Sequence, residues 1–169
     1  MRILGAMARV CNAQRGPAGP PGPPGPAGPP GTGTFGGIYN PAAAVMSLVA
    51  NTYTTLTGLT GAMPSQGMAS TAAELIAEHD GIYLVSYNTT FLRNNAGLLS
   101  FRLTVNNVEV PGSASMQRVN TANAEYNASQ QVLLRLSRLD VLRLAVESSN
   151  TTIVTFPANA TAVTALRVG

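Results

Sequence analysis

Apolar and polar residues alternate along the middle of the chain, which is the pattern of β-strands that bury one face in a core. Residues 82–92 and 99–105 show it most clearly, because bulky side chains occupy alternate positions and polar groups fill much of the rest. The positions on the apolar faces are Tyr83, Val85, Tyr87, Phe91, Leu99, Phe101, Leu103 and Val105. The alternation predicts two half-buried strands.

A hairpin is predicted where the second of these strands ends. Asn106 and Asn107 form a pair that tolerates the positive φ angles of a tight turn, and residues 108–110 then return along the strand. Pro111 and Gly112 stop the returning strand, because proline lacks the N–H that a sheet ladder needs.

The leucine-rich residues 130–147 admit two interpretations. Arg135, Arg138 and the leucines can be drawn on a basic amphipathic helix, which would favour a membrane surface or a partner groove. The same residues also alternate with period two on either side of a break at residues 138–140. The alternating positions are Val132, Leu134, Leu136, Leu142, Leu144 and Val146. Because strand patterns lie on both sides of the segment, two strands are favoured over the helix.

Further strands complete an all-β domain. A last strand is predicted at residues 162–168, and shorter apolar pieces lie at 45–49, 53–56 and 74–77. About eight to ten short strands in one domain suit a two-sheet jelly roll. We therefore expect residues 38–169 to form a single jelly-roll sandwich.

Composition excludes several classes of partner. Only 10% of the residues are charged, and the formal net charge of +3 comes from arginines that are scattered along the chain. Such a distribution does not favour a nucleic-acid surface or a polybasic membrane surface. The chain contains no lysine, which excludes a P-loop lysine and Schiff-base chemistry. No apolar run reaches the length of a membrane span.

A second pattern, with period three, precedes the strands. Residues 16–31 read GPAGPPGPPGPAGPPG, with proline or alanine between the glycines. The glycines are Gly16, Gly19, Gly22, Gly25, Gly28 and Gly31. Only glycine fits where three polyproline II chains crowd one axis, so this period predicts a collagen triple helix and a homotrimer. The alternative is a monomeric proline-rich spacer or a ligand for an aromatic groove, although neither needs glycine at every third position.

The collagen-like stretch divides the chain. We expect residues 1–15 to form an N-terminal tail, 32–37 a glycine-rich hinge where the triplet rule fails, and 38–169 the head. A stalk of five triplets extends roughly 45 Å and is marginal by itself, so the head is expected to hold the three chains in register. Cys11 is the only cysteine and cannot pair within its own chain. It is either a free thiol, the simpler interpretation, or an interchain disulfide in the trimer.

Candidate chemistry is sparse. Glu74, Glu78, His79 and Asp80 are the only cluster of potential metal ligands, and solvated turn residues are the simpler interpretation. A hydrolytic site needs a nucleophile, a base and an orienting group, for which one histidine is a weak start. We therefore expect no enzyme activity, no cofactor and no metal. A stripe of aromatic residues is expected either in the core or at a trimer interface, and its members are Tyr83, Tyr87, Phe91 and Phe101.

Several segments together resemble a known family. The stretches GIYLVSYNTTFL, LSFRLTVNNVEVPGS, VLLRLSRLDVLRLAV and VTALRV are similar to the C-terminal heads of the bacterial collagen-like exosporium glycoproteins. The matching positions are Gly81, Tyr83, Asn107, Val110, Pro111, Gly112 and Asp140. The likeness covers roughly residues 74–168 and includes a collagen-like stalk in the expected order. It implies a homotrimeric jelly-roll head related in fold to tumour necrosis factor and the complement-type heads.

The expected function is structural. The resemblance implies a non-enzymatic trimeric filament whose head drives trimerisation and forms the outer surface of a spore exosporium or a similar coat. The alternative is a receptor- or glycan-binding head of a phage or cell-surface adhesive fibre, in which three heads on one stalk bind multivalently. The expected partners are other copies of the chain, and beyond them coat proteins or a host surface glycan, without nucleic acid.

Overall fold

The computed structural model describes residues 33–169. The collagen-like residues 16–31, with their regular glycines, lie outside the described residues. Cys11 and the rest of the predicted N-terminal tail also lie outside them. The triple helix and the interchain disulfide therefore stay predictions.

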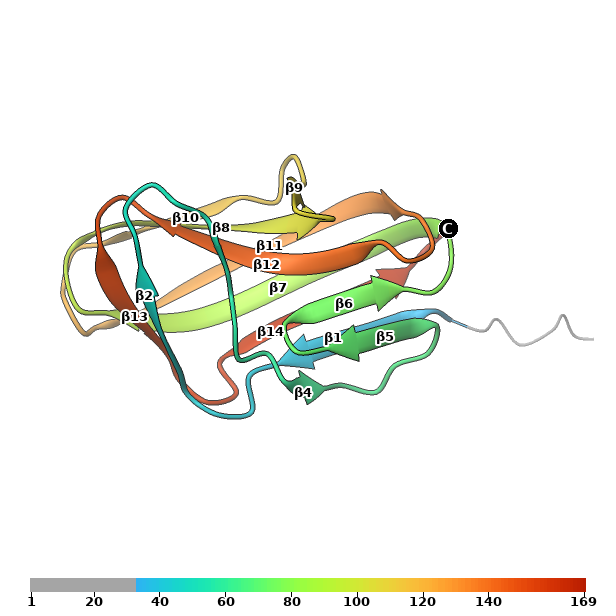
Figure 1. Ribbon diagram of the computed structural model, residues 1–169, viewed down its shortest axis with the longest axis horizontal. Coiled ribbons are helices and arrows are strands. Elements are labelled where there is room, and N and C mark those ends of the chain that lie inside the picture. Colours follow the sequence, from blue (N-terminus) through green and yellow to red (C-terminus); the bar gives the residue numbers. More distant parts are fainter. Residues whose placement is uncertain (1–32) are drawn as a thin grey trace, which may run out of the picture. The chain divides into compact units, whose positions relative to one another are not determined.

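The described part of the chain forms two antiparallel sheets of seven strands each and contains no helix (Figure 1). Sheet A has the order β2 (Ala44–Leu48), β13 (Thr152–Phe156), β7 (Gly81–Arg93), β14 (Thr161–Arg167), β1 (Phe35–Tyr39) and β4 (Gly61–Ala62), with β11 (Glu125–Leu136) also paired to β7. Sheet B has the order β10 (Ser115–Val119), β8 (Gly97–Val105), β12 (Val141–Ser148), β6 (Glu74–Ala77) and β5 (Met68–Thr71), with β3 (Thr54–Thr55) paired to β12 and β9 (Val108–Glu109) to β8. The all-β sandwich that the alternation predicts is confirmed.

The core lies between the inner faces of the two sheets. Phe91 of sheet A and Phe101 of sheet B have ring centroids 5.1 Å apart, and Phe101 meets Phe156 edge-on at 6.4 Å. Tyr83 and Tyr87 are buried in the same core. The aromatic stripe singled out in the sequence therefore lies inside a single copy of the chain, which is one of the two positions expected for it.

The hairpin after β8 forms as predicted. Asn106 and Asn107 have φ angles of 51° and 68°, and Val105 of β8 pairs with Val108 of β9 across them. Gly112 follows with a φ of 76°, in the left-handed region that glycine adopts without steric cost.

The leucine-rich segment forms the two strands β11 and β12, so the helical interpretation is wrong. A turn separates them, with Leu139 at a φ of 73°. The carboxylate of Asp140 fastens this turn, because its oxygens accept hydrogen bonds from the Ser137 N–H and from the Asn106 side-chain amide, each at 2.7 Å. Both turns at this end of sheet B are thus held by one side chain.

The first strand begins inside the segment predicted to be a hinge. β1 starts at Phe35, so the predicted hinge at residues 32–37 and the predicted start of the head at residue 38 are corrected. The glycines there permit close packing of a strand, not flexibility. A Cβ on Gly36 would lie 2.9 Å from the Cβ of Met68, and one on Gly37 would lie 2.7 Å from the sulfur of Met63.

The described residues also contain more strands than the eight to ten that the sequence predicts. Three of them, β3, β4 and β9, have only two residues each. Segments of that length are too short to show an alternation. No helix in the described residues is long and apolar enough to cross a membrane.

Candidate functional site

The outer face of sheet A carries a row of apolar side chains across four strands. The pairing register places Phe35 of β1 beside Leu166 of β14, Leu166 beside Leu84 of β7, and Leu84 beside Leu133 of β11. Leu133 is 61% exposed and Leu166 is 46% exposed. Because neighbouring strands lie about 4.8 Å apart, these four residues, called the apolar row below, form one continuous stripe.

Further apolar groups extend the apolar row. A shallow hollow of about 440 Å³ borders it, and its apolar lining includes Phe35, Met63, Pro64, Leu84, Ala165 and Leu166. Ile82 and Val168 are also exposed at this end of the sheet, where the Val168 N–H donates to the Ile82 carbonyl at 2.8 Å. A contiguous exposed apolar area of this kind marks an interaction surface.

Next to the apolar row, over residues 86–90 of β7, the same face carries polar, uncharged side chains. The hydroxyls of Ser86 and Thr164 lie 2.8 Å apart in hydrogen-bond contact. The side-chain amide of Asn127 donates to Asn88 and to Thr90, each at 3.2 Å. A second hollow of about 540 Å³ lies over these strands, and hydroxyl, amide and alanine side chains contribute to its lining.

The apolar row lies at the end of the head where the described chain begins. The Thr34 carbonyl accepts a hydrogen bond from the Arg167 N–H at 2.8 Å, and the Phe35 N–H donates to the Gln66 carbonyl at 2.9 Å. The start of β1 is therefore fixed next to the C-terminal strand. In Figure 1 both lie at the right end of the head, whereas β2 and β13 lie at the left end.

The charges of the head balance. Residues 33–169 contain seven arginines and seven carboxylate residues, so the chain's net charge of +3 resides in Arg2, Arg9 and Arg15. Residues 32–73 contain no charged residue at all. A neutral head opposes the close approach of its own copies less than a strongly charged one would.

The apolar row is not visible in the sequence. Its four members come from four strands that are far apart in the sequence, and only the pairing register brings them together. One signal was present in the sequence, because Ile82 and Leu84 lie on the same face of residues 82–92 as the polar Ser86, Asn88 and Thr90. Apolar residues on the face that should meet solvent indicate a second buried surface.

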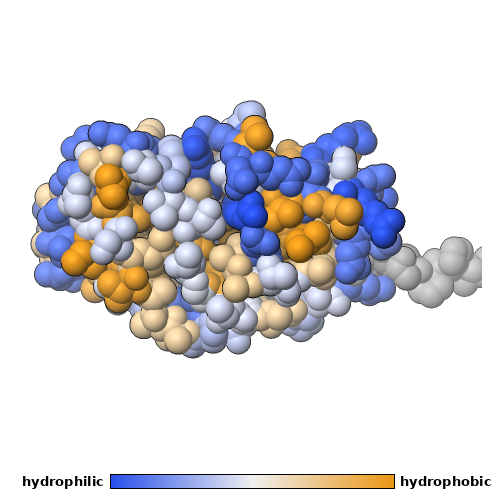
Figure 2. Space-filling view, viewed as in Figure 1, coloured by the Kyte–Doolittle hydropathy of each residue, from blue (hydrophilic) through white to orange (hydrophobic). Residues whose placement is uncertain are grey.

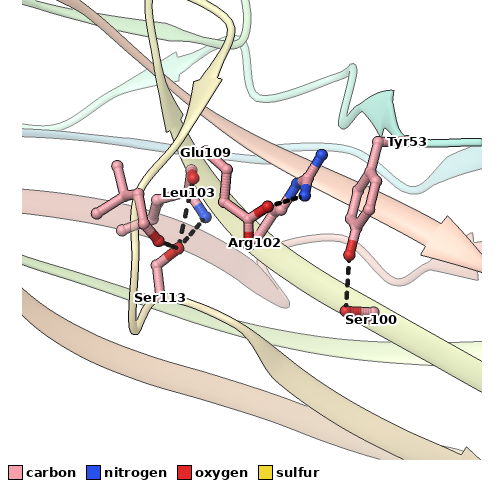
Figure 3. Close-up of polar contacts among 7 residues, drawn as sticks. Tyr53, Ser100, Arg102, Leu103, Glu109 and Ser113 are labelled. Atoms are coloured by element: carbon pink, nitrogen blue, oxygen red, sulfur yellow. Dashed lines mark hydrogen bonds and ion pairs between the residues drawn. The ribbon is translucent and has the colours of Figure 1, made fainter.

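Sheet B carries a polar cluster whose role is structural (Figure 3). Arg102 forms an ion pair with Glu109, and its guanidinium carbon lies 3.2 Å from the centroid of the Tyr53 ring. The Tyr53 hydroxyl contacts Ser100 at 3.1 Å, and the Ser113 hydroxyl accepts a hydrogen bond from a main-chain N–H of β8 at 3.0 Å. These contacts fasten the segment before β3 and the loop after β9 onto β8.

The potential metal ligands singled out in the sequence are not brought together. The carboxylate of Glu74 accepts hydrogen bonds from Arg143 at 2.6 and 2.9 Å, which lowers the pKa of Glu74. Asp80 accepts a main-chain hydrogen bond at 2.6 Å, while Glu78 and His79 border an open hollow of about 660 Å³. Among residues 33–169, no three histidine, cysteine, aspartate or glutamate side chains are grouped so that they could hold a metal ion.

Comparison with known sequences gives no match, either to a family model or to a curated protein. Comparison with solved structures does give matches. The structure of Eiger TNF from S. frugiperda superimposes with a TM-score of 0.60 at 13% sequence identity, covering 82% of this chain and 94% of that one. Murine APRIL at pH 8.0 superimposes with a TM-score of 0.59 at 10% identity, covering 80% of this chain and 99% of that one.

These structural matches bear on the fold alone, because sequence identity is low. They cover most of the chain and nearly the whole of each matched structure, so the likeness extends over the complete sandwich. The chain has the tumour necrosis factor-like jelly-roll fold.

Proposed function

We propose that the chain is a non-enzymatic structural surface protein, a homotrimer in which the head holds three chains together and a short collagen-like stalk carries the heads. The observation that carries this proposal is the apolar row. It lies on a face whose other groups are mostly uncharged, at the end of the head that follows the Gly-X-Y segment. Three copies of this face that meet around one axis remove the apolar row from water.

Chain connectivity supports the same arrangement. Three residues lie between Gly31, the last glycine of the repeat, and Phe35 at the start of β1, and the four steps from Gly31 to Phe35 span at most roughly 14 Å. A triple helix keeps its three chains around a common axis. Three β1 strands that follow one triple helix would therefore begin within that distance of it, which suits a threefold contact through Phe35 and the rest of the apolar row.

The proposed contact is favourable on energetic grounds. Full burial of a leucine side chain contributes about 2 kcal/mol, and a threefold contact buries part of that surface on each of three chains. A clamp of this kind is what a stalk of five Gly-X-Y triplets requires to stay in register.

The proposed setting is the outermost layer of a spore, in line with the resemblance of the sequence to exosporium heads. A cell-surface or phage fibre with the same architecture is the other setting that the stalk and head suit. In either case three heads on one stalk form a multivalent projection.

Sedimentation of the full chain tests the trimer. The wild-type chain is expected at three times its 17.4 kDa mass. Replacing Leu84 and Leu166 together by glutamate places carboxylates in the threefold contact and is expected to give a folded monomer. Val108→Glu is the matched control, since Val108 is 69% exposed on β9 in the other sheet and its replacement should leave the trimer intact. A monomeric wild-type chain, or a double variant that stays trimeric, would contradict the proposal.

A second candidate function, glycan or receptor binding by the head, rests on the hollow beside His79. Apolar Ala69, Ile76 and Leu139 contribute to its lining, together with the polar side chains of Glu78 and Arg138. A lining of apolar side chains with a few polar groups is typical of small-ligand sites. A glycan array probed with the full chain tests it. Saturable binding that Arg138→Ala abolishes would favour this function. A head that binds no glycan would favour the structural role in a surface coat.

A further inference from the structure

Strand β2 is an exposed edge of sheet A. It pairs with β13 along five residues and with no other strand of the described part. In an antiparallel ladder, alternate residues direct their N–H and C=O groups to the neighbour and the others direct them away. Among residues 33–169, no hydrogen bond from another segment reaches the main chain of residues 44–48 on the free side. β2 therefore presents unused donors and acceptors.

The surface beside this edge is hydrophobic. Val45 and Val49 are 66% and 63% exposed, and Ile153 on the adjacent strand is 45% exposed. Figure 2 shows hydrophobic side chains gathered at the left end of the head, over β2 and β13. On the opposite side of β2, Met46 and Leu48 are buried and anchor the strand to the core.

β2 lacks the features that normally keep an edge strand from pairing. Natural sheets protect exposed edges with charged residues, above all lysine, or with proline and bulges. The β2 sequence AVMSL contains none of these residues, and it lies within the uncharged residues 32–73. An unprotected edge is a template for a further strand.

We propose that β2 pairs with β2 of a second copy of the chain, in an antiparallel contact around a twofold axis. With the axis at Met46, Val45 of one copy lies opposite Ser47 of the other, and no charges oppose each other. The strand is complementary to itself in backbone groups and in side chains, which fits a second copy. A contact of this type is isologous, so it closes after two copies.

The β2 contact is separate from the apolar row. β13, which joins β2 to the rest of sheet A, pairs with β7 at Leu92 and Arg93, whereas the apolar row crosses β7 at Leu84. Both contacts can therefore form at once. If the proposed trimer is correct, each trimer has three β2 edges, and a threefold unit joined by twofold contacts propagates into a layer. The formation of a layer rests on the proposed function, because it requires the trimer. The β2 pairing itself does not require the trimer.

Sedimentation velocity of the full chain over a range of concentrations tests the pairing. The wild-type chain is expected to form species that are multiples of its base unit, and electron microscopy should show connected heads. Val45→Lys and Ser47→Lys place a charge on the edge and are expected to weaken the association at least tenfold without changing the mass of the base unit. Val108→Lys, an exposed change on β9, is the control and should associate as the wild type does.

The results of this experiment distinguish the β2 pairing from the proposed trimer contact. If the base unit is a monomer and the lysine changes in β2 still prevent its dimerisation, the β2 pairing stands and the trimer is wrong. The pairing is wrong if the wild-type chain stays at its base mass at roughly 1 mM. It is also wrong if both lysine variants associate like the wild type, or if they break the base unit itself. Circular dichroism of each variant confirms that the fold is intact.

Discussion

At the scale of single residues, Tyr87 shows what alternation predicts and what it leaves out. Its place on the apolar face of residues 82–92 predicts burial, and the side chain is indeed 2% exposed. Its partners are not visible in the sequence: the hydroxyl donates to the carbonyls of Ser113 at 2.9 Å and Phe101 at 3.2 Å. Burial raises the pKa of Tyr87 to about 12. The strand period gives the direction of a side chain, and only the tertiary fold supplies its hydrogen bonds.

This pKa predicts a loss of stability in alkali. The folded chain favours the neutral phenol of Tyr87, whereas in the unfolded chain the phenol ionises near its ordinary value of about 10. The stabilisation is complete below about pH 10 and is lost as the pH rises towards 12, with a total on the order of 3 kcal/mol. No lysine titrates in this range, because the chain has none. Urea unfolding at several pH values above 9 measures the slope.

Tyr87→Phe is the matched variant for that measurement. It keeps the ring in the core and removes the ionisable group, so the decline in unfolding free energy above about pH 10 should become shallower. Burial also raises the pKa of Tyr83, so some decline should remain. An identical slope in the variant and the wild type would contradict the assignment of the alkaline loss to Tyr87.

A pair of adjacent residues tests the strand β12. Leu144 is fully buried, whereas Arg143 on the opposite face pairs with Glu74. Leu144→Ala is expected to lower the unfolding free energy by about 3 kcal/mol, because it leaves a cavity in the core. Arg143→Ala removes a partly exposed ion pair and should cost about 1 kcal/mol or less. Thermal melting checks both, and similar losses at the two positions would contradict a strand with one buried face.

At the scale of elements, the length of a strand determines whether its alternation can be recognised in the sequence. β7 has thirteen residues, and its period of two is plain in the sequence, whereas the leucine-rich part of the twelve-residue β11 also fitted a helix. β1 has the sequence FGGIY. Its two glycines have no side chains that could show an apolar–polar alternation, so the sequence indicated a hinge. The strand forms because Gly36 and Gly37 let it approach Met68 and Met63 closely. Such close approach is a property of neighbours that the local sequence does not contain.

Gly36→Ala tests the correction at β1. A Cβ there would lie 2.9 Å from the Met68 Cβ and 3.3 Å from the Ser65 Cβ, so the change is expected to cost about 1–3 kcal/mol by overpacking. Gly33→Ala is the control, since its nearest neighbour, a Phe35 ring carbon, is 4.0 Å away and the change should be neutral. Differential scanning calorimetry compares the two. If Gly36→Ala melts like the wild type, residue 36 belongs to a flexible hinge after all.

At the scale of the whole molecule, a stalk that only the sequence predicts is joined to a head that the structure describes. Glycine at every third position predicts three chains without reference to any fold. The head adds a face on which three copies can meet, built from Phe35, Leu84, Leu133 and Leu166. The sequence could not predict that face, because strand pairing over more than a hundred residues decides which side chains are neighbours.

The proposed trimer is held together by the head and not by the stalk, and Gly22→Ala in the full chain tests this. A methyl group at the crowded axis should abolish the collagen-like transition in circular dichroism. The head trimer should persist, so sedimentation should still give three times the 17.4 kDa chain mass, with the β-sheet transition unchanged. A variant that loses the collagen-like transition and sediments as a monomer at micromolar concentration would show that the stalk, and not the apolar row, holds the three chains together.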